Sequence, residues 1–228
     1  IEASKNGHLK TVTTLLLAGA SIDKQQNNGM TALHWALKNN HPDTALQLIN
    51  HHAKFNITDK QGRTALLMAT KYNQTGILDK MISAGANINS RDTSGHTLIA
   101  LIAEHNESAP IHSLIKRGAD ANIASNSGNT PLMLAANKGL TSNVQALIHA
   151  TKDVNHKNSN GNTALMLASM NGHKNTVTIL LKNSARLNIR NKNKNTAITL
   201  AELGSHHEIK NLLTKHKTEN ESLWDLIK

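Results

Sequence analysis

Apolar residues recur along the chain at helical spacing, in short stripes that come in pairs. Between residues 163 and 171, Leu165, Leu167 and Ala168 form one stripe, and Thr163 stands where the N-cap of a helix belongs. Between residues 175 and 182, a second stripe has apolar residues at positions i, i+3 and i+4. The pattern predicts two short helices that lie against each other.

The paired stripes repeat with a period of 33 residues. Glycine marks each repeat at Gly29, Gly62, Gly95, Gly128 and Gly161, and Lys194 holds the next place in the series. An apolar residue follows four positions later in every repeat, at Leu33, Leu66, Ile99, Leu132, Leu165 and Ile198. The chain therefore consists of one partial and six full units.

A single unit cannot bury its own apolar face. Helices of about eight residues are marginal in isolation, so each unit must be stabilised by neighbours stacked along one axis. Between the helix pairs come turns such as AGANIN (84–89) and RGADAN (117–122), in which Gly85 and Gly118 can adopt the positive φ that ends a helix. An extended arm then leads to the next glycine.

The period and the motifs resemble those of the ankyrin-repeat family. Its T-P-L-H-x-A signature occurs as TALHWA (31–36), TALLMA (64–69), TPLMLA (130–135) and TALMLA (163–168). The resemblance implies an all-α fold, an ankyrin-repeat solenoid of stacked helix pairs with projecting β-hairpin loops. It covers residues 1–217, which we expect to be the repeat domain. Departures are the TLIALI segment (97–102) and Lys194 in place of glycine.

Residues 218–228 leave the repeat register. Ile227 stands where the next glycine would fall. We expect this segment to be a C-terminal cap, in which Ser222 starts a short helix and Leu223, Trp224 and Ile227 cover the last unit.

Composition narrows the class of protein. The chain lacks cysteine, which excludes disulfides and thiolate sites, and no apolar run reaches the length of a membrane span. These features favour a cytoplasmic protein. The net charge of +10 predicts attraction to acidic partners.

No constellation of catalytic residues is visible, so we expect a protein that is not an enzyme and needs no cofactor. The HPD tripeptide at His41 matches a co-chaperone motif, but His41 shares a repeat position with His8, His173 and His206 and is better explained by the repeat. The fourteen histidines contain no metal-binding motif and are interpreted as solvated surface residues.

In ankyrin proteins, partners contact the residues beside the repeat glycine and those that end the first helix, which line a concave side. Carried over to this chain, those columns are rich in bases. They also hold the only tyrosine, Tyr72, whereas Trp35 falls in a leucine column and is assigned to the core. The predicted partner-binding residues are Lys38, Arg63, Lys71, Tyr72, His96 and His105.

The expected function is a protein–protein interaction module that binds an acidic partner through a basic concave face, as a monomer. Two alternatives stay open. One is binding to nucleic acid or anionic lipid, which the pI favours but the scarcity of aromatic residues opposes. The other is the targeting region of a larger enzyme. The Asn and Lys content suggests an AT-rich genome, and ankyrin proteins of that composition resemble effectors that intracellular bacteria deliver into host cells.

Overall fold

The described part of the protein consists of paired short helices joined by loops. The computed structural model describes residues 1–72, 75–105 and 111–225, and within these ranges the side chains of all residues except 71, 72, 75 and 220–225. The chain divides into two compact units. The first comprises residues 1–101 with 117–119, and the second residues 102–116 with 120–228.

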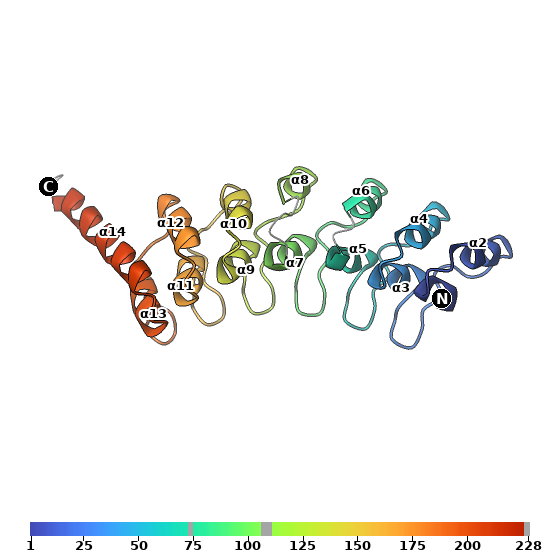
Figure 1. The fold of residues 1–228 in the computed structure, drawn as a ribbon, viewed down its shortest axis with the longest axis horizontal. Helices are drawn as coiled ribbons and strands as arrows, with labels where there is room; N and C mark the ends of the chain where they lie inside the picture. The colour runs from blue at the N-terminus through green and yellow to red at the C-terminus, as the bar shows by residue number, and fades with distance from the viewer. Residues whose placement is uncertain (73–74, 106–110, 226–228) are drawn as a thin grey trace. The chain divides into compact units, whose positions relative to one another are not determined.

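Within each unit, the first helices of the pairs lie between the second helices and the hairpin loops (Figure 1). In the first unit the helices are α1 (Glu2–Lys5), α2 (Leu9–Leu17), α3 (Ala32–Lys38), α4 (Pro42–Asn50), α5 (Ala65–Met68), the 3-10 helix η1 (Ala69–Tyr72) and α6 (Thr75–Ser83). The boundary between units falls within α7 (Leu98–His105). The second unit holds α8 (Ile111–Lys116), α9 (Pro131–Lys138), α10 (Thr141–Ile148), α11 (Ala164–Met170), α12 (Lys174–Lys182), α13 (Ala197–Leu203) and α14 (His207–Asp225).

A threonine begins the first helix of each full repeat. The side chain of Thr163 accepts a hydrogen bond from the Met166 N–H, which satisfies one of the free N–H groups at the start of α11. Thr31, Thr64, Thr97, Thr130 and Thr196 do the same in their repeats. The N-cap predicted from the repeat is therefore confirmed.

The hairpin loops pair along each unit through single backbone hydrogen bonds. Lys60 N donates to Asn28 O at 3.0 Å in the first unit, and Ser159 N donates to Ser127 O at 2.9 Å in the second. No residue of the described ranges is assigned to a β-strand. The tips approach so closely that a Cβ on Gly29 would lie 2.9 Å from Asp59 Cα, which explains a glycine at this repeat position.

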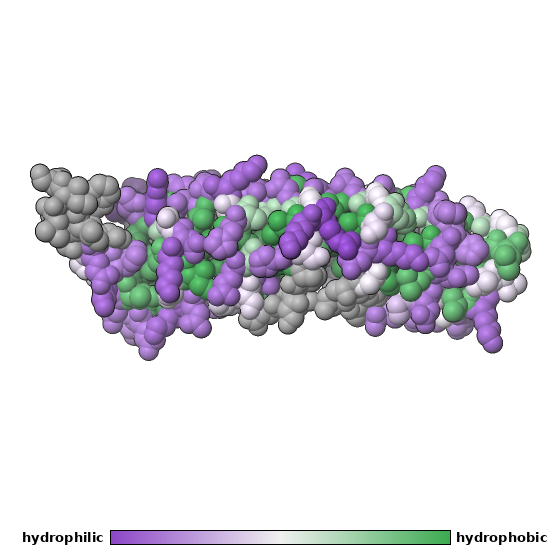
Figure 2. Space-filling view, turned by 90° about the horizontal axis from the view of Figure 1, so that it is seen from above, coloured by the Kyte–Doolittle hydropathy of each residue, from purple (hydrophilic) through white to green (hydrophobic). Residues whose placement is uncertain are grey.

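The core of each unit consists of aliphatic side chains from both helices of every pair. Leu33, Leu66, Leu132 and Leu165, which share one repeat position, are at most 1% exposed. The outer end of α2 is different, because no helix of the described residues packs against its far side. Leu15 there is 45% exposed and Leu17 76%, and Figure 2 shows apolar surface at this end of the first unit.

Several histidines join neighbouring repeats, so interpreting them as solvated surface residues was wrong. The His173 ring lies over Gly139 of the preceding repeat, and its Nε2 is 3.0 Å from Asn137 O. His206 bonds Met170 O in the same way at 3.0 Å. His41 in the HPD tripeptide lies over Gly7, which gives that tripeptide a structural role.

The C-terminal segment also differs from the expectation. Helix α14 runs without interruption through Ser222, so no separate helix starts there. Its buried residues Ile209 and Leu213 belong to the last repeat. Whether Leu223 and Trp224 cover that repeat stays a prediction, since their side chains, like the whole of Ile227, lie outside the described residues.

Candidate functional site

Two lysines lie over one tryptophan at the ends of the first helices of the first unit. Lys5 Nζ is 5.2 Å and Lys38 Nζ 4.7 Å from the centre of the Trp35 ring, distances at which a cation is attracted to the ring face. Lys5 ends α1, and Lys38 holds the same repeat position at the end of α3. We call these three residues the Lys–Trp–Lys cluster.

Trp35 does not lie in the core as its leucine column predicted. Its equivalents Leu134 and Leu200 are 7% and 6% exposed, whereas Trp35 is only half-buried. The indole N–H donates to Gln26 Oε1 at 2.7 Å. An indole needs a partner for its N–H and is too large for a leucine site, so its ring extends to the surface where the lysines lie over it.

The backbone beneath the cluster is fixed by hydrogen bonds from the next repeat. The carbonyl of Lys5 accepts Asn39 Nδ2 at 2.7 Å and also bonds His41 Nε2 at 3.1 Å. Lys5 is further paired with Glu2, at 3.4 Å, whereas Lys38 has no ion pair among the described residues. Lys38 therefore offers an uncompensated positive charge at a position held by the fold.

Arg63, a predicted partner-binding residue, is engaged within its own hairpin. Its Nε and Nη2 donate to Asp59 Oδ2 at 2.9 and 2.6 Å, and the Asp59 side chain is fully buried. Burial disfavours the charged carboxylate, but the hydrogen bonds from the Arg63 side chain and backbone outweigh it and lower the pKa of Asp59. Arg63 thus stabilises the hairpin and has little charge left for a partner.

His34 is the one histidine of the T-P-L-H signature, and it is fully buried. Its Nδ1 accepts the Thr31 N–H at 3.2 Å, and its Nε2 lies 3.1 Å from Arg63 O in the next repeat. This arrangement requires the neutral ring with the proton on Nε2. Burial lowers the pKa of His34, only partly opposed by the Arg63 carbonyl.

The other predicted site residues are not brought into one cluster. His96 Nδ1 is 3.5 Å from Asp92 Oδ2, in the same arrangement as Arg63 and Asp59 one repeat earlier. His105 Nε2 is 3.5 Å from Glu104 Oε2. His105 belongs to the second unit, whereas Lys38, Arg63 and His96 belong to the first. Lys71 and Tyr72 end η1 in the repeat positions of Lys38 and Asn39, and their side chains lie outside the described residues.

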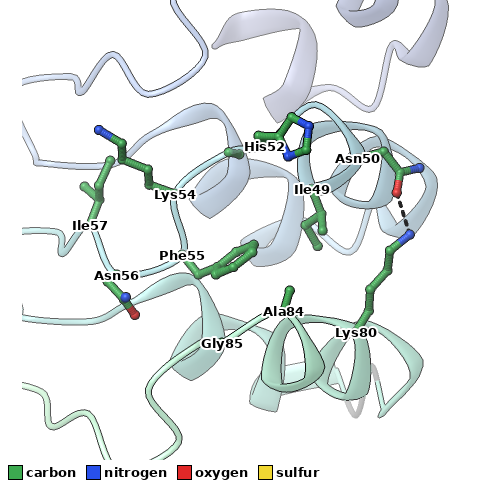
Figure 3. Close-up of a pocket in the computed structure, with 11 residues that line it drawn as sticks. Ile49, Asn50, His52, Lys54, Phe55, Asn56, Ile57, Lys80, Ala84 and Gly85 are labelled. Atoms are coloured by element: carbon green, nitrogen blue, oxygen red, sulfur yellow. Dashed lines mark hydrogen bonds between the residues drawn. The ribbon is translucent and has the colours of Figure 1, made fainter.

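Sequence reasoning missed a groove on the first unit. It lies at the C-terminal ends of the second helices of two neighbouring repeats. It has a volume of about 840 Å³ and lies between the end of α4, the loop that follows it and α6. Figure 3 shows the Phe55 ring directed into the space between Ile49 and Ala84. Phe55, the single phenylalanine of the chain, could have indicated this site. Its repeat position is apolar in every repeat, however, so the sequence assigns it to the core. We call this site the Phe55 groove.

The described residues offer no metal site, because no group of three His, Asp or Glu side chains could hold an ion. In the same part of the chain no helix has the length and apolar character to cross a membrane. What the geometry provides is a set of fixed surfaces with basic side chains.

Comparison with known proteins identifies the fold. The family model for ankyrin repeats matches residues 1–92, 76–158 and 132–222. No curated protein matches the sequence. Among solved structures, the ankyrin repeat domain of Bcl-3, described as a unique member of the IkappaB protein family, is similar with a TM-score of 0.77. The match covers 93% of this chain and 96% of that one at 24% identity, which shows the fold alone.

Proposed function

This chain belongs to the ankyrin-repeat family, and we propose that it is a non-catalytic module that binds an acidic segment of a partner protein through the ends of its first helices. Ankyrin repeats indicate a protein–protein interaction module. The acidic partner and the basic surface are our inference. The surface consists of the Lys–Trp–Lys cluster together with Lys71, which continues the lysine column into the next repeat, and Tyr72, which follows Lys71 in the column of Asn39.

The Lys–Trp–Lys cluster is the observation that carries the proposal. A half-buried indole is the kind of aromatic anchor that is enriched at binding hot spots, and the two ammonium groups beside it supply positive charge that complements an acidic segment. The hydrogen bonds to the Lys5 carbonyl hold the helix end in place before any partner arrives, which reduces the entropy lost on binding. A carboxylate that approached Lys38 would gain a charge-assisted contact without breaking an ion pair seen in the described residues.

Affinity capture with quantitative mass spectrometry tests the proposal. The wild-type chain and the variant Lys38→Glu are used as baits in a cell lysate, and partners lost from the variant are compared. Lys182→Glu is the matched control, because both lysines stand in the last turn of a helix and both changes alter the net charge equally. We expect Lys38→Glu to lose an acidic protein that Lys182→Glu retains. Equal capture by all three baits would show that this surface is not the binding site.

The remaining expectations extend this proposal. We propose a monomer that acts in the cytoplasm, that of a host cell if it is a bacterial effector. If the chain binds nucleic acid or anionic lipid instead, its affinity should fall steeply with salt, and for nucleic acid it should not depend on the base sequence. Titration with labelled oligonucleotides or anionic vesicles at several salt concentrations would show this. A targeting role in a larger enzyme predicts a catalytic region elsewhere in the complete gene.

A further inference from the structure

The Phe55 groove lies outside the surface of the proposed function, and its lining fits a ligand of definite chemistry. We propose that it binds a short acidic peptide segment of a partner protein, which inserts one apolar side chain against Phe55. This would be a second docking site, separate from the Lys–Trp–Lys cluster. The proposal stands on the groove's shape, on its charge and on its recurrence in the second unit.

The floor of the groove is apolar and open. Ile49 and Ala53 are buried at 6% and 3% exposure. The half-buried Phe55 ring lies between Ile49 and Ala84 (Figure 3). The far wall is small, because it consists of Ala84 and Gly85, which directly follow α6. A Cβ placed on Gly85 would meet no atom within 4 Å. A volume of about 840 Å³ lies within the roughly 300–1,000 Å³ typical of ligand sites. One large aliphatic or aromatic side chain with its flanking backbone fits this space.

The rim of the groove is basic and carries amide groups. Lys54 and Lys80 supply two positive charges, and no carboxylate of the described residues lines the groove. The ammonium group of Lys80 is held at the mouth by Asn50 Oδ1, at 2.5 Å, as Figure 3 shows. Asp23 bonds the Lys54 backbone N–H from the preceding repeat but is not part of the lining. Charge complementarity therefore selects a segment with carboxylates beside its apolar residue.

A groove with a related apolar floor occurs in the second unit in the same register. Its lining is displaced by 132 residues, or four repeats, so Leu181, Ala185 and Leu187 replace Ile49, Ala53 and Phe55. Arg186 stands in the place of Lys54, and Arg190 adds a second basic group to a site of about 880 Å³. The wall differs, because His216 and Lys217 replace the small Ala84 and Gly85. Among the described side chains, none that lines this groove is a carboxylate. Because both grooves combine an apolar floor with basic side chains, we expect the peptide to bind at both.

Ala84 allows a direct test because its side chain is exposed and stands at the groove wall. Ala84→Glu adds a carboxylate at the mouth without removing a core contact. Ala18→Glu is its matched control, since Ala18 is also exposed and occupies the same repeat position two repeats earlier, after α2. Peptides of 12 residues are selected from a phage-displayed library against the full chain, synthesised with a dye, and titrated by fluorescence anisotropy.

We expect the selection to enrich peptides that combine Asp or Glu with a Leu, Phe or Tyr. Ala84→Glu should remove binding at the Phe55 groove or weaken it by about tenfold, whereas Ala18→Glu and Lys38→Glu should leave it within about twofold. Because the chain has no cysteine, Ala84→Cys provides a single thiol. The bound peptide should slow its alkylation about fivefold or more, but not that of Ala18→Cys. The proposal is overturned if no peptide is enriched, if the enriched peptides are not acidic, or if Ala84→Glu binds them as the wild type does.

Discussion

The side-chain amide of Asn191 donates a hydrogen bond of 2.8 Å to Oδ1 of Asn162 in the preceding hairpin. The Oδ1 of Asn191 accepts the backbone N–H groups of Asn193 and Asn195, so one side chain closes its own hairpin and ties it to the next. Asn158 has the same arrangement one repeat earlier, where its Nδ2 donates to Oδ1 of Asn129 at 2.8 Å. Asp59 holds the equivalent position in the first unit and pairs with Arg63 inside its own hairpin instead.

This bridge predicts the effect of Asn191→Asp. Aspartate keeps the oxygen that closes the hairpin but loses the N–H donor to Asn162, and its charge then faces an amide oxygen. We expect a loss of about 1 kcal/mol in the free energy of unfolding, and a fall of about 2–4 °C in melting temperature. Asn193→Asp is the control, because it adds the same charge to the exposed tip of the same hairpin. Equal melting temperatures for the two variants would mean that the bridge contributes nothing.

Most of the fold was predictable because the 33-residue periodicity makes each repeat equivalent to its neighbours. The capping threonines and the positive φ of Gly85 and Gly118 followed from single residues whose physical requirements are strict. The continuous helix through Ser222 was not predicted, because serine is also tolerated inside an exposed helix. The buried role of His34 was missed as well, since its partner Arg63 O is a backbone atom of another repeat.

Lys194 occupies the glycine position of the last hairpin with a φ of 64°. A lysine there carries the strain of the left-handed conformation, which costs about 1–2 kcal/mol for a residue with a Cβ. Lys194→Gly should therefore raise the free energy of unfolding by about 1 kcal/mol. Lys192→Gly removes the same charge from the same hairpin where φ is not positive, so it should destabilise the protein slightly. Urea unfolding of both variants checks the prediction, and a shift in the same direction for both would contradict it.

His34 makes stability depend on pH. Because its pKa in the folded protein is below the ordinary value of 6.5, the unfolded chain binds more protons in acid. Its contribution to stability is complete above about pH 6.5 and is lost as the pH falls toward the pKa of the folded state. His34→Leu introduces leucine, the residue found at the same position of the next repeat (Leu67), and should remove this part of the pH dependence. Urea midpoints of both proteins between pH 7.5 and about 5 should fall more steeply for the wild type; parallel curves would exclude the role of His34.

The candidate site was less predictable than the fold, because most of its side chains make contacts that their repeat positions do not specify. The charge of Arg63 is visible in the sequence, but its ion pair with Asp59 depends on the hairpin turning back over four residues. Trp35 stands in a leucine column, and only its size and N–H indicate that it cannot be fully buried there. The Phe55 groove depends on the small Ala84 and Gly85 of the neighbouring repeat, which belong to an ordinary turn motif in the sequence.

Binding kinetics with a captured partner provide the last prediction, which concerns how the basic surface acts. Charge reversal at Lys38 and Lys71 should mainly slow association, by about tenfold at low salt, and flatten its salt dependence, because exposed charges steer an acidic partner more than they hold it. Tyr72→Ala should mainly raise the dissociation rate and cost about 2 kcal/mol if the ring is an anchor. Trp35→Leu, which introduces the residue of its own column, should also speed dissociation because it removes the ring under both lysines. Surface plasmon resonance at several salt concentrations measures both rates, after circular dichroism has shown that each variant folds. If the triple variant Lys38→Glu, Lys71→Glu, Tyr72→Ala binds as tightly as the wild type, the partner docks elsewhere on the repeats.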